Sequence, residues 1–200
     1  MTEYSIRPIN PERDLPTLDE RISRLPLWRR RDTLSYVFPI DRLQSALAWE
    51  LLENLLLRHC GISPYGLRLD RTTLGKPFLR GYPGLHISLS HCPEAAMALV
   101  SDIPAACDVE RIQNPDSQTE AVAELYYSPA ERRLIAGSPD PALEFTKIWT
   151  VKEAVFKLDN SIDIERLDTS ALPPSLSVCS TVEADFVATI ARISPDEMTS

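Results

Sequence analysis

Glycine is scarce in this sequence of 200 residues, which holds 6 glycines against 17 prolines. Loops that bind phosphate through the backbone need several glycines at fixed spacing, and the dinucleotide-binding pattern GxGxxG is absent. Gly61 and Gly66 have the first spacing of a P-loop, but Leu67-Arg68 follows in place of Lys-Ser or Lys-Thr. The common nucleotide-binding loops are therefore excluded. Any phosphate bound by this protein must be held by side chains and a metal.

The chain also lacks a CxxC pair, a long apolar run and the apolar segment of a secretion signal near Met1. Because the four cysteines do not have zinc-site or redox spacing, we expect buried thiols in a reducing compartment. The longest apolar run, about 95–100, is far too short to span a bilayer. These absences predict a soluble, cytoplasmic protein with no membrane partner.

An excess of basic residues is missing as well, since the net charge is −8. This balance argues against general nucleic-acid binding. The charges are unevenly divided: residues 1–100 hold 13 basic and 11 acidic residues, and residues 101–200 hold 8 and 18. Such a division is compatible with cations and carboxylates on opposite sides of one cleft. A solvated acidic surface on the second half is the simpler alternative.

Apolar periodicity predicts the fold class. Leu43, Leu47, Leu51 and Leu55 recur every four residues in the clearest helix, and Gly61 follows as a stop. Helices are expected at about 12–24, 28–31, 40–60, 117–127, 129–136 and 140–158, and strands at about 3–9, 67–70, 85–90, 95–100, 106–112, 176–179 and 184–192. The order strand, helix, strands occurs twice with a break near residue 102. This repeat predicts an α+β protein of two similar lobes, 1–102 and 103–200.

Asp108-Val109-Glu110 is the first candidate for chemistry. On a strand, residues i and i+2 point to the same side, so both carboxylates project together while Val109 packs behind them. Two carboxylates side by side suit Mg²⁺, which takes one or two carboxylates together with waters and substrate phosphate oxygens. The alternative interpretation of this common pattern is that the two carboxylates lie on the solvent-exposed face of an edge strand.

A helix between 140 and 158 holds the second candidate, Trp149-Thr-Val-Lys152-Glu153-Ala-Val-Phe-Lys157. Glu153 and Lys157 are i, i+4 neighbours on one face, where Glu153 can join the carboxylate pair and Lys157 can face a phosphate. A surface salt bridge is the alternative. Phe145, Trp149, Val155 and Phe156 are the expected packed face of this helix.

Two short motifs in the first half are weaker signals. Ser90-His91 ends a strand-like run, where a hydroxyl and an imidazole can bind an anion. A Ser–His catalytic pair is disfavoured because neighbouring strand residues diverge and no G-x-S-x-G elbow is present. Gly75-Lys76-Pro77 is a tight turn that presents one lysine.

These motifs in this order resemble the Sfp-type 4′-phosphopantetheinyl transferases. Gly75-Lys76-Pro77-Phe78 resembles the first motif of that family, and Asp108-Val109-Glu110 resembles its Asp-x-Glu. Trp149 through Lys157 is similar to the third motif. The strand ending in Ser90-His91, the stretch Tyr127-Ser-Pro-Ala-Glu131 and Asp41-Arg42 at the start of the long helix complete the resemblance, which covers about residues 29–158.

The resemblance implies two pseudo-symmetric lobes, each a long helix packed on a small antiparallel sheet, with coenzyme A between them. It implies Mg²⁺-dependent transfer of the 4′-phosphopantetheine arm of coenzyme A to a serine of an apo acyl or peptidyl carrier protein, with release of adenosine 3′,5′-bisphosphate. On this reading Asp108, Glu110 and Glu153 hold Mg²⁺. The implied catalytic residues are Asp108, Glu153, which accepts the serine proton, and Lys157, which stabilises the leaving phosphate.

The resemblance also implies a coenzyme A site. Arg42, Ser90 and His91 are expected on its phosphates, in addition to Asp108 and Lys157, and Lys76 with Pro77 is expected beside the adenine. One of Arg29, Arg30 and Arg31 is expected at the 3′-phosphate. The carrier is expected to dock near 112–140, and the candidate contacts there are Leu125, Tyr126, Arg132 and Arg133.

The sequence departs from the family at two places. Ala105-Ala106-Cys107-Asp108 stands where the family usually has Ile-Gly-Ile-Asp, and Leu158-Asp-Asn follows Lys157 without the usual glycine. A non-catalytic protein of the same fold that binds coenzyme A or a carrier is one alternative, and another Mg²⁺-dependent phosphotransferase or a nuclease is a second. A pseudo-dimeric chain of this kind is expected to be a monomer.

Overall fold

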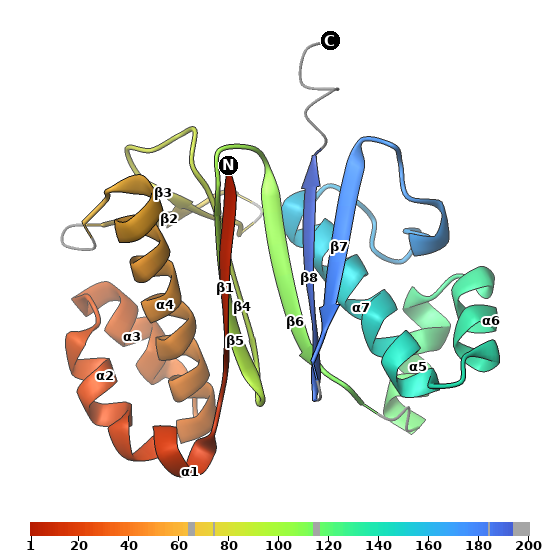
Figure 1. Ribbon diagram of the computed structural model, residues 1–200, viewed down its shortest axis with the longest axis horizontal. Helices are drawn as coiled ribbons and strands as arrows, with labels where there is room; N and C mark the ends of the chain where they lie inside the picture. The colour runs from red at the N-terminus through yellow and green to blue at the C-terminus, as the bar shows by residue number, and fades with distance from the viewer. Residues whose placement is uncertain (64–66, 74, 114–116, 184, 194–200) are drawn as a thin grey trace.

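Two long helices, α4 (Pro39–Cys60) and α7 (Pro141–Leu158), flank two three-stranded antiparallel sheets in the computed structural model (Figure 1). One sheet has the strand order β1-β5-β4 and the other the order β6-β8-β7. The structure describes residues 1–63, 67–73, 75–113, 117–183 and 185–193. Mixed helices and small antiparallel sheets confirm the predicted α+β class.

The first half places its helices on one side of the β1-β5-β4 sheet. Its other elements are β1 (Thr2–Pro8), α1 (Pro11–Asp14), a 3₁₀ turn (Leu15–Thr17), α2 (Leu18–Arg24), α3 (Leu27–Ser35), β2 (Leu69–Arg71), β3 (Pro77–Leu79), β4 (His86–Cys92) and β5 (Ala95–Ser101). Strands β1 and β5 pair from Thr2 opposite Ser101 to Pro8 opposite Ala95. Figure 1 shows α2 and α3 on the outer side of α4.

Helix α4 follows its leucine repeat. Leu43, Leu47 and Leu55 are buried as predicted, whereas Leu51 is only partly covered. Trp49 lies fully buried on the face of α4 that packs against β4 and β5. The helix ends at Gly61, whose φ of 65° is a left-handed conformation that glycine adopts without a Cβ clash.

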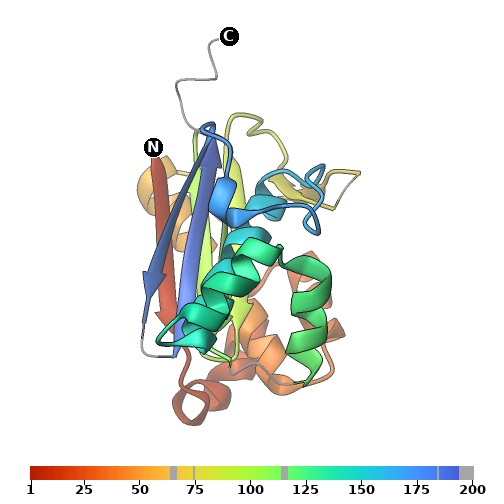
Figure 2. The same ribbon diagram turned by 90° about the vertical axis from the view of Figure 1, so that its right-hand side faces the viewer.

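The second half places α7 on the β6-β8-β7 sheet, with α5 and α6 on the far side of α7 (Figure 2). Its elements are β6 (Ala105–Arg111), α5 (Ser117–Tyr126), α6 (Pro129–Gly137), α7, a 3₁₀ turn (Thr169–Ala171), β7 (Leu176–Val182) and β8 (Phe186–Ile193). Ser128 and Glu131 form a capping box at the start of α6, because each side chain bonds the other residue's backbone N–H.

An apolar cluster fills the space between the two sheets. It is built from buried residues of β4, β5, β6 and β8, including Met97, Cys107 and Val109. The cluster brings β4 and β6 next to each other although they belong to different sheets. The strand that ends in Ser90-His91 therefore lies beside the strand that holds Asp108 and Glu110.

Some local expectations differ from the structure. The strand expected at 67–70 is β2, and it pairs with β3, which begins at Pro77 in the expected turn. On α7, Phe145 and Val155 are buried as predicted, but Trp149 and Phe156 are only half-buried. The expected carrier segment 112–140 includes 114–116, which lie outside the described residues. No helix within the described ranges has the length and apolarity needed to cross a membrane.

Candidate functional site

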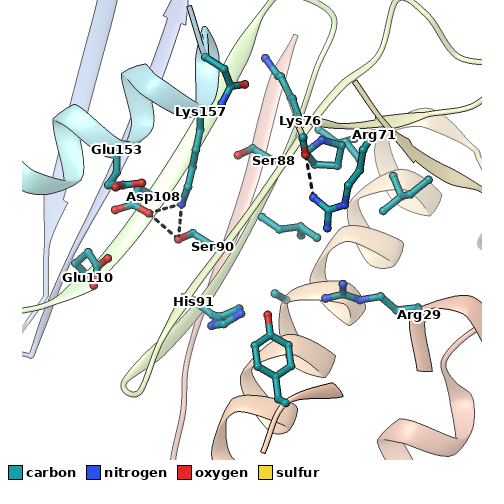
Figure 3. Close-up of a pocket in the computed structure, with 18 of the residues that line it drawn as sticks. Arg29, Arg71, Lys76, Ser88, Ser90, His91, Asp108, Glu110, Glu153 and Lys157 are labelled. Atoms are coloured by element: carbon teal, nitrogen blue, oxygen red, sulfur yellow. Dashed lines mark hydrogen bonds and ion pairs between the residues drawn. The ribbon is translucent and has the colours of Figure 1, made fainter. Parts of the chain in front are cut away.

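A cavity of about 530 Å³ opens where the two halves meet. It is lined from the α3–α4 region, the β2–β3 hairpin, β4, β6 and α7 (Figure 3). The lining residues are Arg29, Tyr36, Ala48, Leu69, Arg71, Gly75, Lys76, Pro77, Ile87, Ser88, Leu89, Ser90, His91, Asp108, Glu110, Trp149, Glu153, Lys157 and Asn160. Charged groups of both signs face this one space, so the cavity is suited to a polar, multiply charged ligand.

The carboxylates gather on the side of the cavity formed by the second half. Asp108 and Glu110 project together from β6, and Val109 between them packs into the cluster between the sheets, as the strand alternation predicts. Glu153 extends from α7 toward the same group (Figure 3). We call Asp108, Glu110 and Glu153 the carboxylate wall.

Lys157 is bound to this wall. Its Nζ lies 2.5 Å from Oδ1 of Asp108 and donates to Oγ of Ser90 at 3.2 Å. Burial acts to lower the pKa of Lys157, but the charge of Asp108 and the hydrogen bond to it outweigh burial, and the pKa is raised. Lys157 therefore stays protonated and can donate a hydrogen bond into the cavity.

The other two carboxylates of the wall carry an electrostatic cost. Burial, with the nearby charge of Asp108, raises the pKa of Glu110 to about 7. Burial also raises the pKa of Glu153, and Asp108 adds to that shift. Three carboxylates share one lysine here, so the wall gains from a further cation.

The carboxylate wall can supply one or two oxygen ligands to Mg²⁺ rather than a complete set. Oδ2 of Asp108 is buried and has no hydrogen-bond partner, while its other oxygen is bonded by Lys157 and Ser90. Within the described part of the chain, no three His, Cys, Asp or Glu side chains form a ready-made metal group. The residues present therefore fit a cation that takes one or two carboxylates and completes its shell with water and substrate oxygens, as Mg²⁺ does.

The opposite side of the cavity carries positive charge. Arg29 donates to O and Oγ of Ser45 at 3.1 and 2.8 Å, and its guanidinium lies 5.7 Å from the centre of the Trp49 ring. Arg71 Nη1 donates to the carbonyl of Gly75 at 2.9 Å. We call Arg29, Arg71 and Lys76 the cation wall (Figure 3).

Lys76 links the two halves. Its Nζ donates to the carbonyl of Leu158 at 2.7 Å, at the end of α7. Burial lowers the pKa of Lys76, and the charge of Asp159 partly offsets this. The lysine of the Gly75-Lys76-Pro77 motif thus faces the cavity and also holds the β2–β3 hairpin against the second half.

His91 lies between the walls as a neutral ring. Its Nδ1 is 3.0 Å from Oε1 of Gln44, and the Tyr36 ring packs edge-on at 6.2 Å. Burial lowers the pKa of His91, and the charges of Arg29 and Lys157 lower it further. The imidazole is therefore uncharged near pH 7 and can reach a ligand only as a neutral hydrogen-bonding group.

The structure brings most predicted site residues to this cavity. Those that line it are Lys76, Pro77, Ser90, His91, Asp108, Glu110, Glu153 and Lys157. Arg42 is not among the lining residues, because its Nε donates to the carbonyl of Tyr36 at 2.8 Å. Of the three consecutive arginines, Arg29 lines the cavity, Arg30 bonds carbonyls that include that of Ile22, and Arg31 lines a different groove.

Sequence reasoning did not assign four polar lining residues to the site: Tyr36, Arg71, Ser88 and Asn160. Arg71 could have been found in principle, because it stands on the face of Leu67 and Leu69, where the alternation of 67–70 predicts an apolar residue, and it precedes the Gly75-Lys76-Pro77 turn. Tyr36 and Asn160 carry no comparable local signal.

Comparison with known proteins agrees with the motif order. The family model described as the 4′-phosphopantetheinyl transferase superfamily matches residues 104–162, which include the whole carboxylate wall and Lys157. The protein named 4′-phosphopantetheinyl transferase psf-1 of Bacillus pumilus is 32% identical over 115 residues, which are 54% of this chain and 48% of that protein. The match therefore spans about half of that relative.

A longer match joins this chain to the protein named 4′-phosphopantetheinyl transferase HetI of Nostoc sp., at 28% identity over 171 residues, 82% of this chain and 70% of that protein. The protein named 4′-phosphopantetheinyl transferase of Bacillus subtilis is 22% identical over 156 residues, 77% of this chain and 66% of that protein.

Proposed function

This chain belongs to the 4′-phosphopantetheinyl transferase superfamily, and we propose that it transfers the 4′-phosphopantetheine arm of coenzyme A to a serine hydroxyl of an apo acyl or peptidyl carrier protein, releasing adenosine 3′,5′-bisphosphate. One observation carries the proposal. The residues that match the third motif of the family and its Asp-x-Glu, far apart in sequence, line one cavity opposite the cation wall.

The reaction needs positioning and charge neutralisation more than covalent chemistry by the protein. The carrier serine oxygen forms a bond to the β-phosphorus of coenzyme A, and the bond from that phosphorus to the bridging oxygen breaks. The leaving bisphosphate takes the negative charge, and the serine proton must be accepted. Enzymes supply such steps by holding the reactants in line and by placing charges where they develop.

Glu153 is our candidate acceptor of the serine proton, directly or through a water. Burial and the charge of Asp108 raise its pKa, which brings the basicity of its carboxylate closer to that of a useful general base. Lys157, held protonated by Asp108, would donate to the leaving phosphate. Mg²⁺ held by one or two of the carboxylates of Asp108, Glu110 and Glu153, with water completing its shell, would neutralise the pyrophosphate charge.

Arg29, Arg71 and Lys76 would hold the phosphates of coenzyme A. Within the described residues none of the three is paired with a carboxylate, so their charge remains available to an anionic ligand. Arg29 is the member of the 29–31 run best placed for a phosphate. Because the neutral ring of His91 donates from Nδ1 to Oε1 of Gln44, its Nε2 would contact the ligand as an acceptor. Pro77 would border the adenine.

The carrier would dock on the second half near α5 and α6. Leu125 and Leu134 are large apolar side chains that are 65% and 50% exposed there. Arg132 and Arg133 lie on α6 and give the same region positive charge. We further propose that residues 1–102 and 103–200 act as two pseudo-symmetric lobes within a cytoplasmic monomer.

A protein of this fold that only binds coenzyme A or a carrier is the second candidate. A decayed site would be expected to lose a member of the carboxylate wall or Lys157, and all four are present.

Incubation with coenzyme A, Mg²⁺ and a panel of apo carrier proteins, read by intact mass, tests the proposal. A carrier should gain the mass of one phosphopantetheine, and Asp108→Ala should abolish the gain. If no carrier gains mass while coenzyme A binds, the binding-protein candidate is correct.

A further inference from the structure

Strands β4 and β6 meet without a backbone ladder. They are the facing edges of two separate sheets, with strand orders β1-β5-β4 and β6-β8-β7. An edge strand presents backbone N–H groups that must find partners when they are buried. On β6 these groups belong to Cys107 and Val109, which are both fully buried.

Two serine hydroxyls of β4 take the place of the missing carbonyls. Cys107 N donates to Oγ of Ser88 at 3.0 Å, and Val109 N donates to Oγ of Ser90 at 3.3 Å. Ser88 Oγ also donates to the carbonyl of Cys107 at 3.4 Å. Both serines are at least nine-tenths buried, and the two-residue step of the serines matches the two-residue step of the amides.

The second of these hydroxyls also orients the carboxylate wall. Ser90 Oγ donates to Oδ1 of Asp108 at 2.8 Å and accepts from Lys157 Nζ at 3.2 Å (Figure 3). Lys157 donates to the same Oδ1, so Asp108 is held through one oxygen and its buried Oδ2 is left without a partner.

The hydrogen-bonding capacity of Ser90 is therefore full. A serine hydroxyl has one proton to donate and two lone pairs that accept. The proton goes to Asp108, and the lone pairs accept from Val109 N and Lys157. A phosphate oxygen needs a donor, and the only donor of Ser90 is already used. This arrangement differs from the phosphate contact that the sequence led us to expect of Ser90.

We propose that Ser88 and Ser90 are positioning residues: they form a side-chain ladder that holds β6 against β4, and Ser90 aims Asp108 so that Oδ2 is presented to a cation. The structural part of this proposal is independent of the reaction. Its catalytic consequence rests on the proposed transferase function.

The first test measures amide hydrogen exchange by NMR in Ser88→Ala and Ser90→Ala. Loss of one buried hydrogen bond should speed exchange about fivefold at Cys107 in the first variant and at Val109 in the second. Ser101→Ala is the matched control. Ser101 is a fully buried serine of β5, and its hydroxyl accepts from the backbone N of Ile103, away from the contact between β4 and β6. Equal exchange changes at Cys107 and Val109 in the control would overturn the ladder.

The second test measures Mg²⁺ and Mn²⁺ binding by calorimetry, without carrier. Removing a residue that orients a metal ligand typically weakens metal binding 10- to 100-fold, and we expect about 10-fold for Ser90→Ala. Ser90→Thr, which keeps the hydroxyl, should restore the affinity. Binding of coenzyme A in metal-free buffer should change less than twofold in Ser90→Ala. Weaker coenzyme A binding with unchanged metal binding would make Ser90 a phosphate ligand and overturn the proposal.

The two failures are distinguishable. Altered exchange at Cys107 and Val109 without any transfer to a carrier would remove the proposed function and leave the ladder intact. Transfer with unaltered exchange in both alanine variants would remove the ladder and leave the function.

Discussion

The two walls of the cavity hold their charges in different ways. On the cation wall, Arg29, Arg71 and Lys76 donate to backbone carbonyls, which satisfies hydrogen bonds without cancelling charge. On the carboxylate wall, Asp108 is paired with Lys157, while Glu110 and Glu153 are partly buried with raised pKa values. The cation wall is therefore preformed for an anion. The carboxylate wall carries more acidic groups than Lys157 offsets, so a further cation would stabilise it.

Replacing Glu153 tests the carboxylate wall most directly. Glu153→Gln keeps the shape of the side chain and removes its ability to accept a proton, so transfer should fall on the order of 10²–10⁴-fold. Coenzyme A binding should remain. Single-turnover transfer to an apo carrier, with calorimetry for coenzyme A, measures both.

Glu144→Gln is the matched control, because Glu144 lies on the same helix and lines a different groove beside Leu134 and Thr169. If both variants lost transfer equally, Glu153 would have no special role.

The helix behind the carboxylate wall is anchored by a buried ion pair, which has no counterpart on α4 among the described residues. Lys152 Nζ lies 3.1 Å from Oε2 of Glu131, and both side chains are 0% exposed. Lys152 also donates to the carbonyl of Leu167 and lies 5.8 Å from the centre of the Tyr127 ring. Glu131 accepts from Ser128 N and Thr169 N at 2.7 Å each.

Lys152→Met should lower the free energy of unfolding by about 3–5 kcal/mol, because it leaves Glu131 buried without a counter-charge. Adding Glu131→Gln should recover part of the loss. On α4, the volume-conserving Leu47→Met should cost less than about 1.5 kcal/mol. Urea denaturation of the three variants makes the comparison, and a Lys152→Met cost as small as that of Leu47→Met would show that the pair does not anchor α7.

Arg71→Ala tests the cation wall. Removing one charged hydrogen bond to a phosphate should weaken coenzyme A binding about 10-fold. Arg80→Ala is the control from the same hairpin, because Arg80 Nε is paired with Oδ2 of Asp70 at 2.7 Å and does not line the cavity. Calorimetry in metal-free buffer gives both affinities. If both variants lost the same affinity for coenzyme A, binding would depend on the intact β2–β3 hairpin and not on the charge of Arg71.

Glu110 gives a pH-dependent effect, and its sign follows from its pKa. Because the folded pKa of about 7 lies above the unfolded 4.5, the folded state binds more protons over this interval, and stability falls as pH rises through it. Glu110→Gln cannot ionise, so its folding stability should not fall in this way as pH rises. Without metal the variant should be more stable than the parent by about 1–3 kcal/mol above pH 7, and the difference should vanish below pH 4.5. Thermal unfolding from pH 4 to 8 measures it, and a pH-independent difference would contradict the assignment.

Local periodicity predicted much of the fold because it acts within one element. The four-residue leucine repeat identified α4, and the two-residue alternation of Asp108-Val109-Glu110 placed both carboxylates on one side of β6. The same reasoning misjudged α7. Trp149 and Phe156 are only half-buried, whereas Lys152 is fully buried because its partner Glu131 lies on another helix.

By itself the sequence determined that Asp108 and Glu110 share one side of a strand and that Glu153 and Lys157 share one face of a helix, because strand alternation and the i, i+4 helix repeat are short-range. The prediction that these two pairs belong to one site came from the resemblance of the motif order to a known family. Only the tertiary structure decided that Arg29 and Arg71 face this wall, that Arg42 does not line the cavity, and that the one donor of Ser90 is used on Asp108. The bond between Ser90 and Asp108, for example, joins residues that are 18 positions apart and lie on strands of different sheets. Their distances depend on how two sheets meet, which no local pattern encodes.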